Sequence, residues 1–375
     1  MKTTGQLEVQ EMAKRLCTRN VHGWFTTTHH SLFLDTEGLP FFEAGPPQTL
    51  PDNCVDMSTL PSLSSDVANA FANAKAEGRP AFIPYITAGY PRAPDTVPVL
   101  LTLQANGADI IEIGVPFSDP IADGNTIQAA NQQALDNGVS LQDTIEYVVE
   151  ARKQGLTVPI VLMGYYNPFL QFGEQKLVDT CADARIHGFI VVDLPPVEAL
   201  QFRTICDSRD MCLVPLVSPT TTDERLAVMG ACQTPCVPAC VCLFMPVLCS
   251  HVICFLLCFF IAGCFFVARV LVCGVLPPGQ MAKGYVYCVS LNGVTGARTE
   301  LPEHLGAFLD RVRVHMKCPL AVGFGLSTRA HVKAVGQLAD GAIIGSAVIK
   351  ALAKGKNTAE SVASVGKYVF EVTHD

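Results

Sequence analysis

The chain has 375 residues, a formal net charge of −8 and sixteen cysteines. This length allows one large domain or two ordinary ones. The acidic balance, without any Lys/Arg-rich run, argues against nucleic acid or an anionic membrane surface as a partner. Eight cysteines lie between Cys236 and Cys273, the other eight are scattered singly, and no Cys-x-x-Cys pair occurs. The scattered cysteines therefore indicate reduced side chains in an intracellular enzyme.

Residues 1–62 match no packed pattern, and we expect a poorly ordered or targeting extension. No apolar run follows the first methionine, which argues against a secretory signal. In the first twenty residues Lys2, Lys14, Arg15 and Arg19 outnumber Glu8 and Glu11, so a transit peptide is an alternative; the location would then be the plastid stroma instead of the cytoplasm. The histidines of this extension lack partner ligands, so we predict no metal site.

From residue 63 to 375, short apolar strands alternate with amphipathic helices. The predicted strands span 81–87, 109–114, 159–163, 188–193, 212–217, 285–290, 319–323 and 341–344. The predicted helices span 63–76, 94–106, 141–154, 174–185, 197–207, 222–232, 301–315 and 328–337, with a further pair at the C-terminus. This alternation indicates a parallel sheet covered on both faces. Eight such units match a (β/α)₈ TIM barrel better than a doubly wound sheet.

The strand 109–114 carries a carboxylate, Glu112, among three isoleucines. A carboxylate in an apolar strand is costly unless it is paired or protonated, so its pKa should rise. Glu112 is therefore a candidate general acid/base at a strand end. The alternative is a structural role, in which the carboxylate of Glu112 accepts hydrogen bonds from backbone N–H groups in the following loop. That loop, constrained by glycines and prolines, carries two more acids, Asp119 and Asp123.

Glycines follow the last two predicted strands, at Gly325 and at Gly345-Ser346. Glycine lets backbone N–H groups approach a ligand, and a helix N-terminus favours an anion. Two such sites at consecutive strand ends predict a phosphate site, which a third turn containing Gly296 could close. Tyr165 and Tyr287 lie at or just past strand ends, where they could serve the site or equally pack in the core with satisfied hydroxyls.

The letters Ile-Glu-Ile-Gly-Val-Pro-Phe-Ser-Asp-Pro-Ile-Ala-Asp-Gly at 111–124 resemble, almost letter for letter, the signature of the tryptophan synthase alpha chain family. Further matching pieces stand at 84–89, 165–168, 193–196, 293–296, 323–325 and 345–346. The resemblance extends over 65–233 and 281–370.

This resemblance implies a carbon–carbon lyase of tryptophan biosynthesis that cleaves indole-3-glycerol phosphate to indole and glyceraldehyde 3-phosphate. By the resemblance, Glu112 protonates the indole ring and Asp123 holds the indole N–H. Tyr287 lies close to the reacting glycerol. The residues implied to bind phosphate are Gly296, Gly325, Gly345 and Ser346, and those implied to form the indole pocket are Tyr85, Met163, Tyr165 and Phe324.

The same resemblance implies that this chain needs no metal or organic cofactor. The expected partner is a beta chain, which carries pyridoxal phosphate. The partner would dock on the loops after the second and third strands, near Asp119, Pro120, Asn167 and Pro168. Some relatives work alone and release free indole, and the sequence does not separate the two cases.

The stretch 234–280 breaks the pattern. Val237–Ala268 contains no charged residue and has the length and apolarity of a transmembrane helix, but its prolines and its position in mid-barrel argue against a genuine span. Its deletion leaves an ordinary helix-to-strand connection. We interpret it as translated non-coding sequence, such as a retained intron; the alternatives are an inserted anchor and an unusual loop.

Two other functions compete with this prediction. A Schiff-base aldolase would need a lysine at a strand end, and none of the eight predicted strands contains one. A catalytically silent barrel could act as a scaffold or allosteric partner of a beta chain, although the presence of Glu112 and Asp123 speaks against it.

Overall fold

The computed structural model describes residues 62–196, 198–231, 284–290, 304–323 and 325–374, which all belong to one compact unit, Ser58–Asp375. The strands are β1 (Ala81–Thr87), β2 (Ile111–Gly114), β3 (Ile160–Gly164), β4 (Gly188–Val191), β5 (Cys212–Leu213), β6 (Leu216–Val217), β7 (Val286–Val289), β8 (Leu320–Gly323) and β9 (Gly341–Ile344). The first helices are α2 (Leu63–Ala76), the 3₁₀ turn η2 (Ala93–Asp95), α3 (Thr96–Ala105), α4 (Asn125–Asp136), α5 (Leu141–Lys153), α6 (Tyr166–Phe172) and α7 (Glu174–Asp183). They are followed by α8 (Leu200–Ser208), α9 (Asp223–Ala231), α11 (Leu305–His315), α12 (Arg329–Gly336), α13 (Ser346–Leu352) and α14 (Thr358–Thr373).

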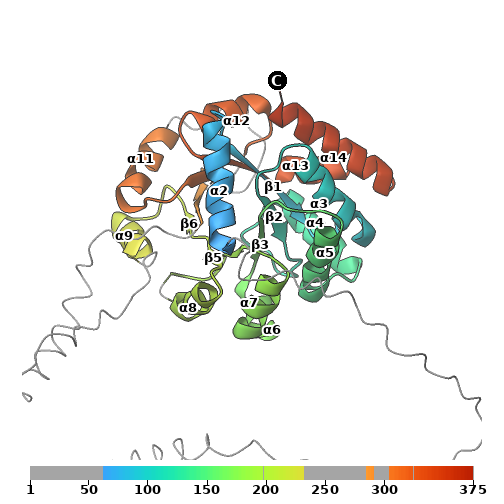
Figure 1. The fold of residues 1–375 in the computed structure, drawn as a ribbon, viewed down its shortest axis with the longest axis horizontal. Coiled ribbons are helices and arrows are strands. Elements are labelled where there is room, and N and C mark those ends of the chain that lie inside the picture. The colour runs from blue at the N-terminus through green and yellow to red at the C-terminus, as the bar shows by residue number, and fades with distance from the viewer. Residues whose placement is uncertain (1–61, 197, 232–283, 291–303, 324, 375) are drawn as a thin grey trace, which may run out of the picture. The chain divides into compact units, whose positions relative to one another are not determined.

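The strands form one parallel sheet in the order β5-β4-β3-β2-β1-β9-β8-β7-β6, and the helices surround it (Figure 1). The two edge strands, β5 and β6, are separated in the chain by only Val214 and Pro215. Val214 N donates to Phe189 O of β4 at 2.9 Å, and Tyr287 N of β7 donates to Pro215 O at 3.0 Å. β5 and β6 are therefore two halves of one barrel strand. The sheet closes into the predicted eight-stranded (β/α)₈ barrel.

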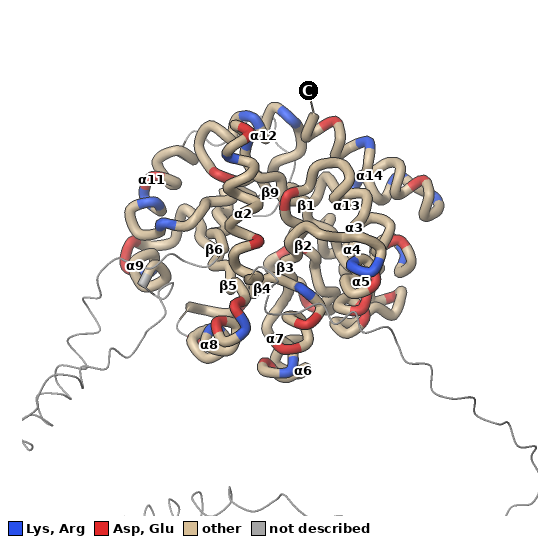
Figure 2. Tube along the Cα trace, viewed as in Figure 1, with Lys and Arg blue, Asp and Glu red and all other residues tan. Residues whose placement is uncertain are grey.

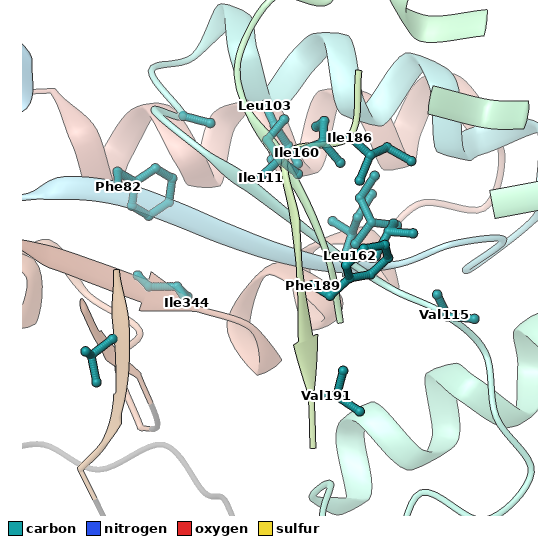
Figure 3. Close-up of a cluster of buried hydrophobic side chains, with 14 of the residues drawn as sticks. Phe82, Leu103, Ile111, Val115, Ile160, Leu162, Ile186, Phe189, Val191 and Ile344 are labelled. Atoms are coloured by element: carbon teal, nitrogen blue, oxygen red, sulfur yellow. The ribbon is translucent and has the colours of Figure 1, made fainter. Parts of the chain in front are cut away.

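Side chains alternate between two cores along each strand, as the period of two requires. On β3, Ile160 and Leu162 pack outward against the helices, whereas Val161 lies in the barrel interior. On β9, Ile344 packs outward and Ile343 inward. Figure 3 shows part of the outer core, which is the larger of the two clusters.

Helix α2 closes the N-terminal end of the barrel. Its Val67 and Phe71 belong to the interior cluster, and the Phe71 ring lies 5.4 Å from the ring of Tyr285. Asp66 of α2 forms a 2.6 Å salt bridge with Arg185, which precedes β4. This end is thus plugged by side chains, which leaves the opposite, C-terminal end for ligands.

The structure differs from the sequence prediction in three elements, one of which is helix α6 (Tyr166–Phe172), where a loop was predicted. The predicted strand 212–217 is interrupted because Pro215 has no N–H to donate to the ladder. Helix α4 lies in a stretch that we had not predicted to be helical. Its buried positions are Ala130, Asn131 and Ala134, which give only a weak apolar stripe in the sequence.

Acidic and basic residues are interspersed along the outer helices of the described chain (Figure 2). None of the helices among these residues is long and apolar enough to cross a membrane. The predictions for residues 1–61, for 234–280, for Gly296 and for Phe324 concern parts of the chain that lie outside the described residues.

Candidate active site

A cavity of about 220 Å³ opens at the C-terminal ends of the strands. Seven of the residues predicted from the sequence line it: Tyr85, Asp123, Met163, Tyr287, Gly325, Gly345 and Ser346. They come from β1, β3, β7 and the segments that follow β2, β8 and β9. The barrel therefore brings together residues that are up to 261 positions apart in the chain, Tyr85 and Ser346.

Glu112 lies in β2, level with Tyr85 of β1 and Val161 of β3. Its side chain is fully buried and is not among the described residues that line the cavity. The Tyr285 hydroxyl donates a 2.8 Å hydrogen bond to Glu112 Oε1, and Oε2 has no hydrogen-bond partner among the described residues. Burial raises the pKa of Glu112 to about 8, although the bond from Tyr285 acts in the opposite direction. Glu112 is therefore a neutral acid at pH 7.

Asp123 lies in the loop between β2 and α4 and lines the cavity. Tyr165, which follows β3, donates to Asp123 Oδ2 at 3.2 Å and accepts a hydrogen bond from Ala122 N at 3.0 Å. The Tyr165 ring stacks on Phe117 at 4.9 Å. Burial raises the pKa of Asp123 to about 6, and the Tyr165 bond offsets part of that rise. Tyr165 thus supports the Asp123 loop and is not among the described lining residues.

Two tyrosines line the cavity, and each requires a glycine on the neighbouring strand. A Cβ atom on Gly323 would collide with the hydroxyl of Tyr287, and one on Gly114 would collide with the hydroxyl of Tyr85. The hydroxyl of Tyr85 also lies 3.2 Å from Thr87 Oγ1. Burial raises the pKa of both phenols, so each is a neutral hydroxyl at physiological pH.

The glycines after β8 and β9 lie on one wall of the cavity. Gly325 has a φ of +80°, which favours glycine, and Gly345 and Ser346 begin helix α13. The loop after β8 is held from outside because the hydroxyl of Tyr368 in α14 donates to Ser327 O at 2.8 Å. Backbone N–H groups at this wall are suited to an anion.

The comparisons with known proteins identify the family and agree with the barrel fold. The family profile described as "Tryptophan synthase alpha chain" matches residues 71–234 and 279–373. The chain belongs to the tryptophan synthase alpha chain family. This confirms the resemblance seen in the signature at 111–124, and it makes the chain a lyase and the alpha component of tryptophan synthase.

Relatives in this family align with most of the chain. The tryptophan synthase alpha chain of Roseiflexus sp. is 41% identical, over 77% of this chain and 92% of that protein. The tryptophan synthase of Saccharomyces cerevisiae is 43% identical over 76% of this chain, which spans only 34% of the yeast protein. A solved structure of Mycobacterium tuberculosis tryptophan synthase superposes with a TM-score of 0.63 at 30% identity, over 82% of this chain and 98% of that one.

Of the residues predicted to meet a beta chain, Asp119 and Pro120 lie in the loop after β2, whereas Asn167 and Pro168 lie in helix α6, which follows β3 and where a loop was predicted. Asp119 and Asn167 are exposed, whereas Pro120 and Pro168 are partly buried. Two apolar neighbours that we had not predicted are also exposed at this end: Ile121, at 87%, and Leu170, at 49%.

Sequence reasoning missed Tyr285, the hydrogen-bond partner of Glu112. This residue could have been predicted, because Tyr285 and Tyr287 are two positions apart in the predicted strand 285–290 and should therefore point to the same face. It also missed Lys350 and Tyr368, which line the cavity from α13 and α14.

Proposed function

We propose that this alpha chain cleaves indole-3-glycerol phosphate by general acid/base catalysis, with Glu112 and Asp123 as the reacting carboxyls. The observation that carries the proposal is the pair of carboxyls whose burial raises their pKa values to about 8 and about 6. At pH 7 one is a proton donor and the other is predominantly an anion. Such a pair, held at the C-terminal end of a TIM barrel, suits proton transfer near neutrality.

In the reaction, Glu112 gives its proton to C3 of the indole ring, which becomes an indoleninium cation. Removal of the proton from the adjacent glycerol hydroxyl then breaks the bond between C3 and the glycerol carbon. The bonding electrons return to the ring to give indole, and the hydroxyl-bearing carbon becomes the aldehyde of glyceraldehyde 3-phosphate. The hydroxyl proton restores the acid form of Glu112.

The carboxylate of Asp123 accepts a hydrogen bond from the indole N–H and stabilises the positive charge that develops on the ring. Both roles require Asp123 to be ionised. Glu112 is not among the described residues that line the cavity and accepts a hydrogen bond from Tyr285, so its carboxyl must turn from Tyr285 toward the ring. Its second oxygen, which has no hydrogen-bond partner among the described residues, makes that turn less costly. Tyr287 projects into the same cavity and supports the glycerol hydroxyls.

The indole plane is placed between apolar and aromatic side chains. Tyr85 and Met163 line the cavity, we assign Phe324 to the same pocket from the family resemblance, and Tyr165 contributes through its bond to Asp123. The phosphate is assigned to backbone donors at Gly325, Gly345 and Ser346, with Gly296 from the turn after β7. No organic cofactor or metal is needed in this chain for these steps.

We propose a beta chain with pyridoxal phosphate as the partner, seated on Asp119, Pro120, Asn167 and Pro168. The exposed side chains of Ile121 and Leu170 support such a docking surface, because apolar groups this exposed are commonly covered by a partner. Release of free indole by the chain alone is the alternative.

The domain organisation is also a proposal. It consists of an extension at 1–62 and a barrel at 63–375 that is interrupted by 234–280. The family profile resumes at 279 after stopping at 234, which supports a barrel whose two parts are joined across the inserted stretch. We place the protein in the cytoplasm, or in the plastid stroma if the extension contains a transit peptide.

One experiment tests the proposed function. The full-length chain is incubated with indole-3-glycerol phosphate, and indole release is followed with and without a beta chain. Release that is strongly accelerated by a beta chain supports an alpha component, whereas fast release without one supports a stand-alone lyase. A chain that releases no indole in either case but still accelerates a beta chain is a scaffold.

A further inference from the structure

One face of helix α13 turns toward the cavity. The lining residues on this element are Ser346, Ala347, Lys350, Ala351 and, in the turn that follows, Lys354. Counted from Ser346, the other four residues lie one, four, five and eight positions further along the chain, which places all five on a single helical face. Ser346, already assigned to the phosphate, and Lys350 are one turn apart on that face.

The two lysines on this face have no acidic partner among the described residues, although both line a cavity that also contains Asp123. Neither Lys350 nor Lys354 forms a salt bridge with any described residue, whereas Arg79, Arg185 and Arg209, for example, each have a carboxylate partner. Among the described lining residues the only carboxylate is Asp123. The α13 wall of the cavity therefore carries positive charge that no described group balances.

The direction of the side chains matters as much as their charge. In a helix the Cα–Cβ bonds tilt toward the N-terminus, so the stem of Lys350 leads back toward Ser346 and Gly345. The stem of Lys350 therefore starts toward the backbone N–H groups of Gly345 and Ser346, although the residue as a whole is exposed. Lys354 lies one turn further along the face, toward solvent.

We propose that Lys350 and Lys354 select a dianionic phosphate ester in this cavity, with Lys350 as a direct ligand of the phosphate and Lys354 as a second, more distant cation. The backbone donors supply hydrogen bonds but no full charge, so they bind neutral and singly charged groups as well as a dianion. Two ammonium groups match the charge of a phosphate monoester near neutral pH. This inference rests on the proposed function, because it assigns the phosphate of that substrate.

The test uses the full-length chain and glycerol 3-phosphate as the probe, with binding measured by calorimetry. A charge-assisted contact is stronger than a neutral one, so Lys350→Gln should weaken binding by about tenfold and Lys354→Gln by less. Lys350→Arg should restore most of the affinity. The matched control is Lys356→Gln, which removes the same charge two residues beyond Lys354 but is not among the described lining residues; it should leave the affinity nearly unchanged.

A second measurement separates phosphate recognition from general damage. Lys350→Gln should raise the KM for indole-3-glycerol phosphate with little change in kcat, and it should leave cleavage of phosphate-free indole-3-glycerol unaltered. Equal weakening by the Lys350 and Lys356 variants, no weakening by either, or a wild-type chain that does not bind glycerol 3-phosphate would overturn the inference. A chain that binds the probe through Lys350 but releases no indole would refute the proposed function and leave this assignment standing.

Discussion

The hydroxyl of Tyr285 donates a 2.8 Å hydrogen bond to Oε1 of Glu112 in the barrel interior, where both side chains are at most 1% exposed. A hydrogen bond to a carboxylate lowers its pKa, and desolvation raises it. Here desolvation is the larger effect, and the pKa of Glu112 rises to about 8. Tyr285 therefore orients the carboxyl in its protonated form, which is the form that can donate a proton to the substrate.

Glu112→Gln should remove the transferable proton while keeping the size of the side chain. General acid/base groups contribute on the order of 10²–10⁴ in rate, and one residue that serves two transfers should lie at the upper end. We expect kcat for indole release to fall by that factor. Asp119→Asn is the control: it changes an exposed acid in the next loop and should act mainly through a beta chain. A Glu112→Gln variant that keeps more than about a tenth of the wild-type kcat would show that the assignment is wrong.

The same substitution should change how stability depends on pH. Folding raises the pKa of Glu112 from its ordinary value of 4.5 to about 8, so the folded state holds a proton that the unfolded state has released within this window. This stabilising contribution is present below pH 4.5 and is lost as the pH rises toward 8. The stability of the wild type relative to Glu112→Gln should therefore decline across the window, by at most about 1.4 kcal/mol per pH unit.

Denaturant unfolding of both proteins at several pH values between 5 and 9 measures this decline. A difference in unfolding free energy that stays constant over the whole range would mean that Glu112 is not buried as a neutral acid. A difference that moves in the opposite direction would mean that the folded state prefers the carboxylate.

Tyr165→Phe should shift the acid limb of the pH–rate profile to higher pH. The Tyr165 hydroxyl bonds to Asp123 and lowers its pKa, which burial has raised to about 6. Without that bond the carboxylate form is lost at a higher pH, so kcat/KM should fall more at pH 6 than at pH 8. Tyr166→Phe is the matched control, because the hydroxyl of Tyr166 bonds to Glu174 instead. Equal losses at both pH values would contradict the role given to Asp123.

The barrel could be predicted from the sequence because its strands are short apolar runs separated by helices at regular intervals. The break between β5 and β6 follows from Pro215, and it could have been predicted from the missing N–H. Helix α4 could not, since its buried face consists of two alanines and an asparagine, which are too small or too polar to produce a clear apolar period.

Site residues could be predicted where the residue type is unusual for its surroundings, as with the acid Glu112 among the isoleucines of its strand. The supporting residues of the site were less visible. The sequence around Lys350 and Tyr368 is ordinary for amphipathic helices. The position of these two residues at the cavity depends on how α13 and α14 pack against the barrel. Local sequence carries little information on that packing. The bond from Tyr368 to Ser327 O joins positions 41 residues apart.

Gly345→Asp should raise the KM for indole-3-glycerol phosphate by more than tenfold, because it adds a negative charge beside the place of the phosphate. The fold should tolerate a side chain here: an added Cβ would lie 3.4 Å from Tyr85 Cδ1, its nearest neighbour. Gly345→Ala adds the bulk without the charge and should have a much smaller effect. If inhibition by a glycerol phosphate analogue is the same in the Asp variant as in wild type, the phosphate lies elsewhere.

The last prediction concerns 234–280, which we expect to be dispensable. Helix α9 ends at Ala231 and the described chain resumes at Gly284, just before β7, so the stretch connects a helix to the start of a strand. Such connections lie at the N-terminal face of a TIM barrel, whereas active sites lie at the C-terminal face. The family profile likewise stops at 234 and resumes at 279.

A chain that lacks 234–280 should therefore fold and release indole at least as fast as the full-length chain. It should also be more soluble, because a long uncharged apolar stretch favours aggregation or membrane association. A variant in which a Gly/Ser-rich linker of equal length replaces 234–280 separates composition from length, and it should match the deletion in solubility. Loss of indole release in both variants would show that the stretch is required for the working enzyme. Sequencing of the mature transcript tests the retained-intron interpretation, which fails if every copy of the message keeps the stretch.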